Sequence, residues 1–136
     1  MDQFQVFVAG AGRIGTHETQ PVTVHFASAY SPYGPVVAGP QGLEYLTLRR
    51  RFDPGAQWMP EQAQRLRDLP DRQHRTHLSA ALQPLCAAPI PDACAVATPL
   101  FEDDLCSALL VDVGAGGTWV APTRADRFLY VLTGAI

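Results

Sequence analysis

A short pattern of turn residues occurs twice in this 136-residue chain. The segment 53–60 reads Asp-Pro-Gly-Ala-Gln-Trp-Met-Pro, and the segment 115–122 reads Ala-Gly-Gly-Thr-Trp-Val-Ala-Pro. In each copy an apolar or alternating run reaches a glycine turn, which is followed by a tryptophan and a proline. The second copy continues into Phe-Leu-Tyr-Val-Leu-Thr-Gly over 128–134. Strands separated by glycine turns in this way are typical of a small β-barrel or sandwich.

The pattern of polar and apolar residues indicates several short strands. Alternation with period two places side chains on opposite faces of a strand, and short apolar runs are typical of buried strands. Glycine and proline residues over 31–35 and 39–42 indicate turns between them. The predicted strands cover 3–9, 21–26, 43–52, 106–113 and 128–132.

The middle of the chain differs in composition from both ends. A charged segment over 61–69 predicts a short helix, and residues 71–82 predict a second, with Asp71 as its N-cap. Together they form a short helical insertion around 61–82. Residues 83–100 contain four prolines and are expected to form a linker or long loop. Many short strands with little helix predict a single all-β domain over residues 1–136.

The charge balance excludes an extended nucleic-acid interface. All ten basic residues are arginines, and 13 acidic residues give a net charge of −3. The densest basic run is Arg49-Arg50-Arg51, and alternate side chains on a strand face opposite ways. These arginines are therefore expected to be solvated charges at a strand edge, and we expect no nucleic-acid partner.

The cysteines and the N-terminus indicate a soluble cytoplasmic protein. The chain has three cysteines, Cys86, Cys94 and Cys106, and no Cys-x-x-Cys pair. An odd number without such a pair favours reduced, buried thiols over disulfides or a zinc knuckle. The apolar run over 6–11 is too short for a signal peptide or a membrane span, so no membrane partner is expected. No serine or cysteine has a nucleophile signature, and the three adjacent acids over 102–104 indicate a solvated turn.

Residues 10–15 read Gly-Ala-Gly-Arg-Ile-Gly, which matches the dinucleotide-binding fingerprint. The fingerprint requires a helix whose N-terminus holds the pyrophosphate, and an acidic residue about 20 positions further on for the ribose. Five residues separate Gly15 from Pro21, and residues 30–33 contain no acid. The glycines are therefore expected to shape a hairpin or bulge.

The histidines give a weak indication of a metal site. Asp71, His74 and His77 are spaced three residues apart, so on a helix they would share one side. Neighbouring arginines would repel a cation, and solvated surface histidines are the simpler interpretation. His25 alternates with Val24 along a predicted strand and is expected to be exposed or hydrogen-bonded. His74 and His77 remain the candidate metal ligands.

The segment 113–136 resembles the first motif of the cupin superfamily. Residues 114–117 supply the glycine turn of that motif, and residues 128–134 supply its aromatic and Val-Leu-x-Gly ending. Residues 121–127 stand where the family has His-x-His and Glu, and residues 59–62 also lack His-x-His. The resemblance implies a cupin-like double-stranded β-helix, or jelly roll, without an intact metal centre.

The resemblance implies an interior pocket for a small-molecule ligand. The candidate ligand-binding residues are Trp58, Trp119 and Tyr130, with Glu61 and Arg127 as polar contacts; alternatively, the aromatic side chains belong to the core. The expected function is a small-molecule-binding or accessory domain, more consistent with binding than with catalysis and without a cofactor. One alternative is a metal-dependent dioxygenase or isomerase that uses iron, manganese or zinc through atypical ligands.

A further alternative is a structural dimerisation module. A cupin would continue past Ile136 through a second motif, so we expect either that the chain is incomplete at the C-terminus or that the barrel is completed by the N-terminal strands or a partner. An apolar terminal strand over 128–136 would need covering. Strand exchange in a homodimer would provide that cover.

Overall fold

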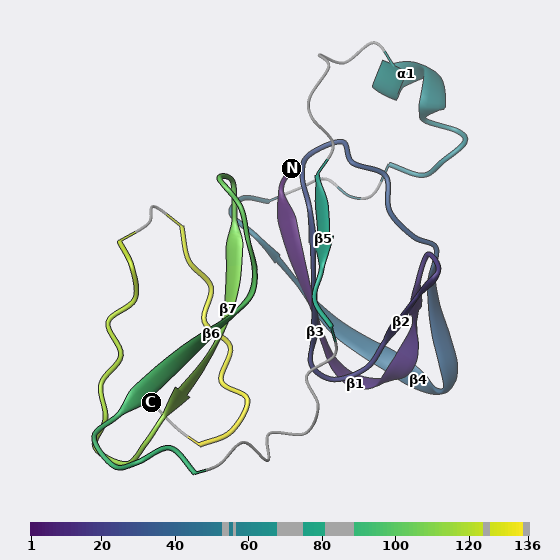
Figure 1. Ribbon diagram of the computed structural model, residues 1–136. Coiled ribbons are helices and arrows are strands. Elements are labelled where there is room, and N and C mark those ends of the chain that lie inside the picture. The colour runs from purple at the N-terminus through teal and green to yellow at the C-terminus, as the bar shows by residue number, and fades with distance from the viewer. Residues whose placement is uncertain (53–54, 56, 68–74, 81–88, 124–125, 135–136) are drawn as a thin grey trace.

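The computed structural model describes residues 1–52, 55, 57–67, 75–80, 89–123 and 126–134 (Figure 1). The described residues are mostly β-structure, with one short helix. In chain order the elements are β1 (Gln3–Ile14), β2 (His17–Thr19), β3 (Thr23–Ala27), β4 (Val36–Arg49), α1 (Ala63–Arg67), β5 (Thr76–Leu78), β6 (Ala95–Glu102) and β7 (Ser107–Val113).

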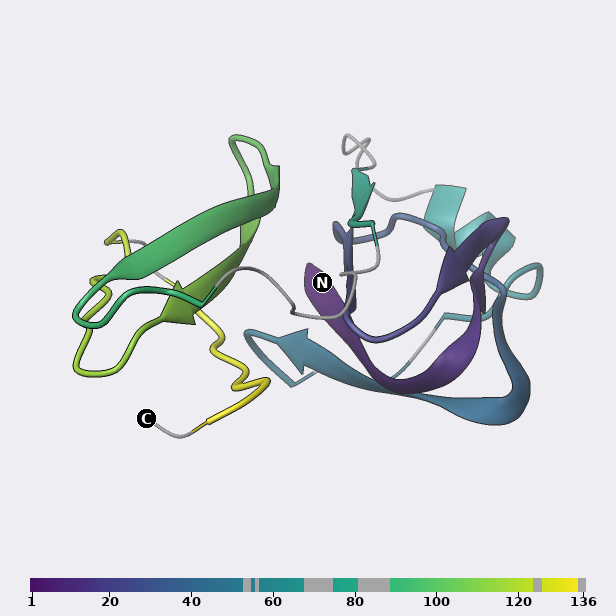
Figure 2. The same cartoon turned by 60° about the horizontal axis from the view of Figure 1, so that its bottom comes forward.

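Five of these strands form one antiparallel sheet. Its order is β2-β1-β3-β5, and β4 pairs with the other edge of β1. The long strands β1 and β4 bend together, so that the sheet curls into a half-barrel (Figure 2). The prediction of an all-β fold is therefore confirmed at the level of a curled antiparallel sheet.

The alternation along β1 divides the sheet into two faces. Gln3, Gln5 and Phe7 lie on the concave face, and Phe4 and Val6 lie on the convex face, because neighbouring side chains point to opposite sides. The paired strands extend both faces in register, since β3 and β4 both lie opposite residues 3–7 of β1. Phe7 is fully buried at 0% exposure.

The hairpin of β6 and β7 forms a separate two-stranded sheet. Aromatic side chains connect it to the convex face of the curled sheet. The Phe4 ring contacts the Phe26 ring at 5.0 Å, the Phe101 ring at 6.4 Å and the Phe128 ring at 6.5 Å between centroids. Both faces of β1 are thus covered, one by the curl of the sheet and the other by the hairpin and the segment that follows it.

The glycines of the dinucleotide-like motif lie within β1 and its turn into β2. The register of β1 against β4 shifts between Phe7 and Ala9 and again between Gly10 and Gly12, as in β-bulges. A Cβ at Gly10 would lie 2.3 Å from the Gly42 carbonyl oxygen, and Gly10 has φ +72°. The bulge prediction is confirmed: these glycines allow two backbones to approach closely.

Most of the predicted strands are confirmed, with changed limits. The segments 3–9, 21–26, 43–52 and 106–113 fall on β1, β3, β4 and β7. Residues 39–42 were expected to turn, and they lie within the span of β4 as an irregularity: the β1–β4 register passes from Gly10–Leu43 to Gly12–Ala38, so these four residues have no partner on β1. The segment 128–132 is not a strand, since it pairs with no other strand among the described residues.

Two expectations for the middle of the chain are wrong. Within the segment expected to be a second helix over 71–82, Thr76–Leu78 form β5 on the edge of β3. Within the expected linker over 83–100, residues 95–100 belong to β6. In both places an available strand edge supplies hydrogen-bond partners that outweigh weak local preferences. The helical insertion is reduced to α1 within the described residues.

None of the described helices is long and apolar enough to span a membrane.

Candidate ligand-binding site

Polar side chains, rather than apolar ones, fill much of the concave face. Gln3, Gln5 and His25 are 7%, 2% and 4% exposed. Gln5 lies directly opposite His25 in the register of β1 and β3. Burying such groups costs free energy unless they are hydrogen-bonded, so their partners define what the site can do.

The two glutamines and the histidine form a network around the Tyr33 hydroxyl group. Nδ1 of His25 lies 2.8 Å from Oε1 of Gln5. The Tyr33 oxygen accepts hydrogen bonds from Nε2 of Gln3 at 2.6 Å and from Nε2 of Gln5 at 3.3 Å. Nε of Arg49 donates to Oε1 of Gln3 at 2.9 Å. Each glutamine amide therefore has one orientation: its oxygen faces a donor, Arg49 or His25, and its nitrogen faces the Tyr33 oxygen.

The network leaves one acceptor and one donor for a ligand. Burial lowers the pKa of His25 to about 4, so its ring is neutral at neutral pH. With the proton on Nδ1 facing the Gln5 carbonyl, Nε2 keeps a free lone pair. The Tyr33 oxygen already accepts twice, so its own hydrogen remains to be donated. Among the described residues neither atom has a further partner.

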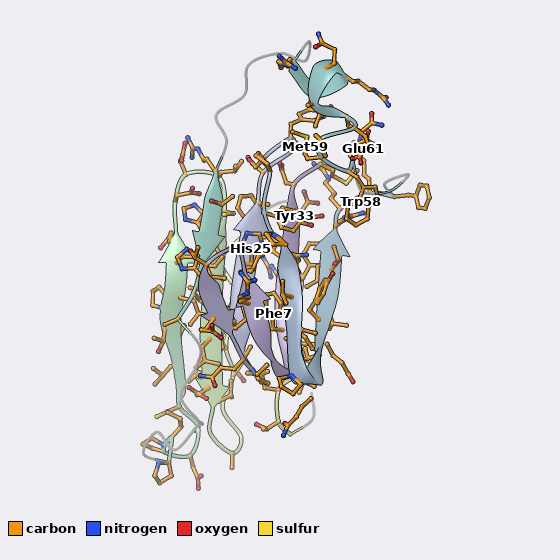
Figure 3. All side chains as sticks on the ribbon, turned by 90° about the vertical axis from the view of Figure 1, so that its right-hand side faces the viewer. Phe7, His25, Tyr33, Trp58, Met59 and Glu61 are labelled. Atoms are coloured by element: carbon orange, nitrogen blue, oxygen red, sulfur yellow. The ribbon has the colours of Figure 1, made fainter. Side chains whose placement is uncertain are left out.

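Aromatic and apolar side chains surround these polar atoms (Figure 3). The Tyr33 ring lies 5.1 Å from the His25 ring, and the Tyr45 ring lies 5.4 Å from the Phe7 ring. Figure 3 shows Trp58, Met59 and Glu61 above Tyr33, His25 and Phe7, at the end of the curled sheet that carries α1. The concave face thus has a polar centre, an aromatic wall and an exposed aromatic rim.

The five ligand-binding residues predicted from the sequence lie on two different segments. Trp58 and Glu61 belong to the rim just described, and Trp58 is 74% exposed. Trp119, Arg127 and Tyr130 lie on the segment after β7, which runs beside the β6–β7 hairpin (Figures 1 and 2). Arg127 there donates to the carbonyl oxygen of Pro122. The structure does not bring the five into one pocket, and their role in binding stays a prediction.

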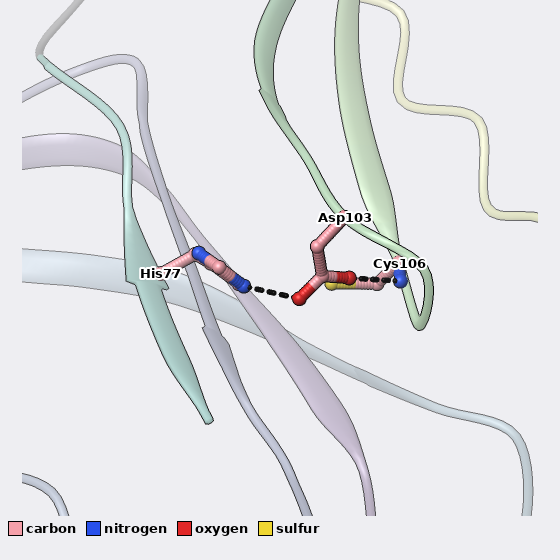
Figure 4. Close-up of side chains that lie close together, drawn as sticks. All are labelled: His77, Asp103 and Cys106. Carbon is pink, nitrogen blue, oxygen red and sulfur yellow. Dashed lines mark hydrogen bonds and ion pairs between the residues drawn. The ribbon is translucent and has the colours of Figure 1, made fainter.

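A second cluster of chemically active side chains lies on the convex side (Figure 4). His77 on β5 meets Asp103 and Cys106, which belong to the turn between β6 and β7. Nε2 of His77 lies 2.7 Å from Oδ2 of Asp103. The Phe101 ring stacks on the His77 ring at 5.2 Å between centroids. The cluster therefore joins the curled sheet to the hairpin.

Hydrogen bonds hold the Asp103 carboxylate in place and keep it ionised. Its Oδ1 accepts the backbone N–H groups of Leu105 at 2.8 Å and Cys106 at 2.7 Å. The Cys106 hydrogen bond and the His77 hydrogen bond lower the pKa of Asp103 far below its usual range. Burial, together with the charge of Asp103, raises the pKa of the Cys106 thiol to about 12.

Sequence reasoning identified His77 but did not foresee its partner Asp103. Its expected neighbours Asp71 and His74 lie outside the described residues, and its observed partner is Asp103, 26 positions away. Asp103 was expected in a solvated turn. It does lie in a turn, but its side chain is partly buried and is hydrogen-bonded to His77. Cys106 is buried as expected, whereas Cys94 is exposed, and Cys86 lies outside the described residues.

His25, Gln5 and Tyr33 were also missed as a group. A possible signal was the polar face of the first strand, where Gln3 and Gln5 recur at period two. In an all-β fold with both faces covered, such a face must lie inside the molecule. The alternative of a satisfied hydrogen bond for His25 is confirmed.

No protein-family model matches this chain, and neither the curated proteins nor the solved structures that were compared with it include a match.

Proposed function

We propose that this chain is a cupin-like, cytoplasmic small-molecule-binding domain whose ligand occupies the concave face of the curled sheet. The observation that carries the proposal is the buried polar network on that face. Ligand pockets in proteins are mostly apolar or aromatic, with a few placed polar groups that fix the orientation of the ligand. The concave face has this composition, with Nε2 of His25 and the Tyr33 hydroxyl group as the groups that remain available.

The chemistry of the site favours a small, neutral ligand. The imidazole of His25 is uncharged at neutral pH, so the two groups that remain for the ligand, this imidazole and the Tyr33 hydroxyl group, are both neutral. A ligand that donates to Nε2 and accepts from Tyr33 needs a donor and an acceptor close together. The accessible aromatic rings of Tyr33, Tyr45 and the rim residue Trp58 favour a flat ring. A cyclic amide is the simplest molecule with these properties.

Binding is favoured over metal-dependent catalysis on this face. Within the described part of the chain, the one group of three side chains placed to hold a metal ion is His77, Asp103 and Cys106. That group lies on the opposite side of the sheet. A cupin oxygenase would need its ligands inside the barrel, where His25 contributes a single imidazole that is already hydrogen-bonded to Gln5.

The proposal is tested with 2-pyridone, a planar ring with adjacent N–H and carbonyl groups, by saturation-transfer NMR and by Trp58 fluorescence in a Trp119→Phe background. We expect binding that Tyr33→Phe weakens by about 5–10-fold, the effect of losing one hydrogen bond. N-methyl-2-pyridone, which cannot donate to Nε2, should bind more weakly by a similar factor.

Tyr130→Phe is the matched variant, because it removes a tyrosine hydroxyl group from the segment after β7. It leaves binding unchanged if the ligand occupies the concave face, whereas weaker binding in Tyr130→Phe would place the ligand on that segment. Binding that is insensitive to Tyr33→Phe would contradict the proposed site. The absence of binding by both pyridones would contradict the ligand class and favour a structural dimerisation module.

A further inference from the structure

The His77, Asp103 and Cys106 cluster combines an imidazole, a carboxylate and a thiol from two separate sheets. We propose that these three side chains form a tetrahedral transition-metal site, best suited to Zn²⁺, which links the β6–β7 hairpin to the curled sheet. Imidazole, carboxylate and thiolate are the three ligand types that zinc binds in proteins. Three protein ligands leave the fourth position for water or a further group.

The spacing of the donor atoms is close to that of a zinc site. One ligand atom from each of the three residues lies within 4.8 Å of the other two. Zinc bonds of about 2.0–2.3 Å in a tetrahedron separate the donor atoms by about 3.5 Å. The widest pair would therefore contract by about 1 Å, and Nε2 of His77 and Oδ2 of Asp103, now 2.7 Å apart, would move apart by slightly less than that as the hydrogen bond between them is replaced by the metal ion. Asp103 and Cys106 already belong to one turn, held by the hydrogen bond from the Cys106 N–H group to Asp103.

The charges around the cluster favour a divalent cation. Carboxylates of Asp103 and Asp104 pair with the single guanidinium of Arg75, and the carboxylate of Asp2 acts on Cys106 as a further negative charge. Three negative charges against one positive charge leave a net charge of −2. Arg75 is 3.4 Å from Asp103 and closer to Asp104, so it can stay paired with Asp104 when Asp103 binds a metal ion.

The order of the three residues argues against a nucleophilic cysteine. In a catalytic triad the histidine lies between the nucleophile and the acid, so that it can remove the proton of the nucleophile. Here Asp103 occupies the central position, bonded on one side to His77 and on the other to the backbone of Cys106. The buried thiol has beside it a carboxylate of lowered pKa, which is a very weak base, rather than an imidazole. A metal ion would displace the thiol proton and bind the resulting thiolate directly.

The site is tested with Co²⁺, which reports a thiolate ligand by charge-transfer absorption and tetrahedral geometry by visible bands. The full chain is purified without a histidine tag, treated with chelator and titrated with Co²⁺ and then Zn²⁺. We expect tetrahedral cobalt–thiolate absorption that zinc abolishes. Cys106→Ala should remove the thiolate band, whereas Cys94→Ala, the matched control at an exposed cysteine, should retain it.

A second variant tests the site without altering the buried thiol. Asp103→Asn should weaken Co²⁺ binding at least about 10-fold, the minimum effect of losing even an outer partner of a metal ligand. His17→Ala, which removes an exposed histidine on β2, should leave the spectrum unchanged. Zinc should also raise the unfolding temperature of the unmodified chain. Absence of the thiolate band in the unmodified chain, or its persistence in Cys106→Ala, would overturn the proposal.

This site and the concave face are separable by experiment. The metal cluster lies on the convex side of the sheet, so Cys106→Ala should leave 2-pyridone binding intact. Tyr33→Phe should likewise leave the cobalt spectrum unchanged. Loss of both signals in one variant would indicate loss of the fold, which far-ultraviolet circular dichroism measures directly.

Discussion

The buried imidazole of His25 should make the stability of this protein depend on pH in a defined window. The ring is 4% exposed, and burial lowers its pKa from 6.5 to about 4. Below pH 6.5 the unfolded chain binds a proton at His25, whereas the folded chain does so only near pH 4. Because the unfolded state holds more protons in this interval, the free energy of unfolding falls as the pH falls from 6.5 to 4.

The size of the effect follows from the two pKa values. One pKa unit corresponds to about 1.4 kcal/mol, so the full difference for His25 is at most about 3 kcal/mol. Relative to pH 7, the expected loss from this one group is about 2 kcal/mol at pH 5 and about 3 kcal/mol at pH 4. For a domain whose total stability is about 5–15 kcal/mol, such a loss is readily measured.

Urea unfolding at pH 7, 6, 5 and 4 measures this dependence, with His25→Asn as the control. Asparagine does not titrate and keeps an N–H donor near the position of Nδ1, which faces Gln5. The exposed His17 and the acidic residues are present in both proteins, so their contributions cancel in the difference. Parallel curves of unfolding free energy against pH for the two proteins would refute the argument. Such a result would mean that the His25 ring is hydrated or protonated in the folded state.

Four further substitutions test the packing. Gly10→Ala should cost more than 2 kcal/mol in urea unfolding, because φ +72° and a backbone oxygen 2.3 Å from the new Cβ both oppose it. Gly116→Ala should cost about 1 kcal/mol, because Gly116 has φ +68° but open space around the new Cβ. Equal losses of stability for the two glycine variants would contradict the close approach of the β1 and β4 backbones at Gly10. Phe26→Ala, at 2% exposure, should cost about 3–5 kcal/mol, and a cost below 1 kcal/mol would place Phe26 outside the core. Tyr33→Phe should cost about 1–3 kcal/mol, because it removes the oxygen that accepts hydrogen bonds from the Gln3 and Gln5 amide groups. An unchanged urea midpoint would show that water takes the place of the lost hydroxyl group.

Local patterns were sufficient to locate most of the strands. The alternation over 3–9 and 43–52 places residues on faces that the observed register of β1 and β4 confirms, with Gln5 opposite Thr47 and Phe7 opposite Tyr45. The absence of a helix after Gly15 could also be inferred, since the spacing to Pro21 leaves no room for one. These features depend on neighbouring residues alone, and so they are visible in the sequence.

The errors fall where a segment depends on a distant partner. Thr76–Leu78 have no strong local preference and become a strand because β3 offers a free edge. Residues 95–100 were predicted to belong to a proline-rich loop, yet they lie in β6, which pairs with β7, and the register shifts after Pro99. Conversely, the apolar run over 128–132 is a good strand sequence without a strand partner among the described residues.

The sequence by itself determined a β-rich chain, the alternating faces of its longest strands and the use of its glycine motif as a bulge, because each depends on residues within one turn or one strand. Tertiary structure alone decided that the Gln3 and Gln5 face lies inside the curl with His25, since that requires knowing what covers each face. It alone placed His77 against Asp103, because an edge strand and a hairpin turn 26 residues apart meet only after the two sheets have packed.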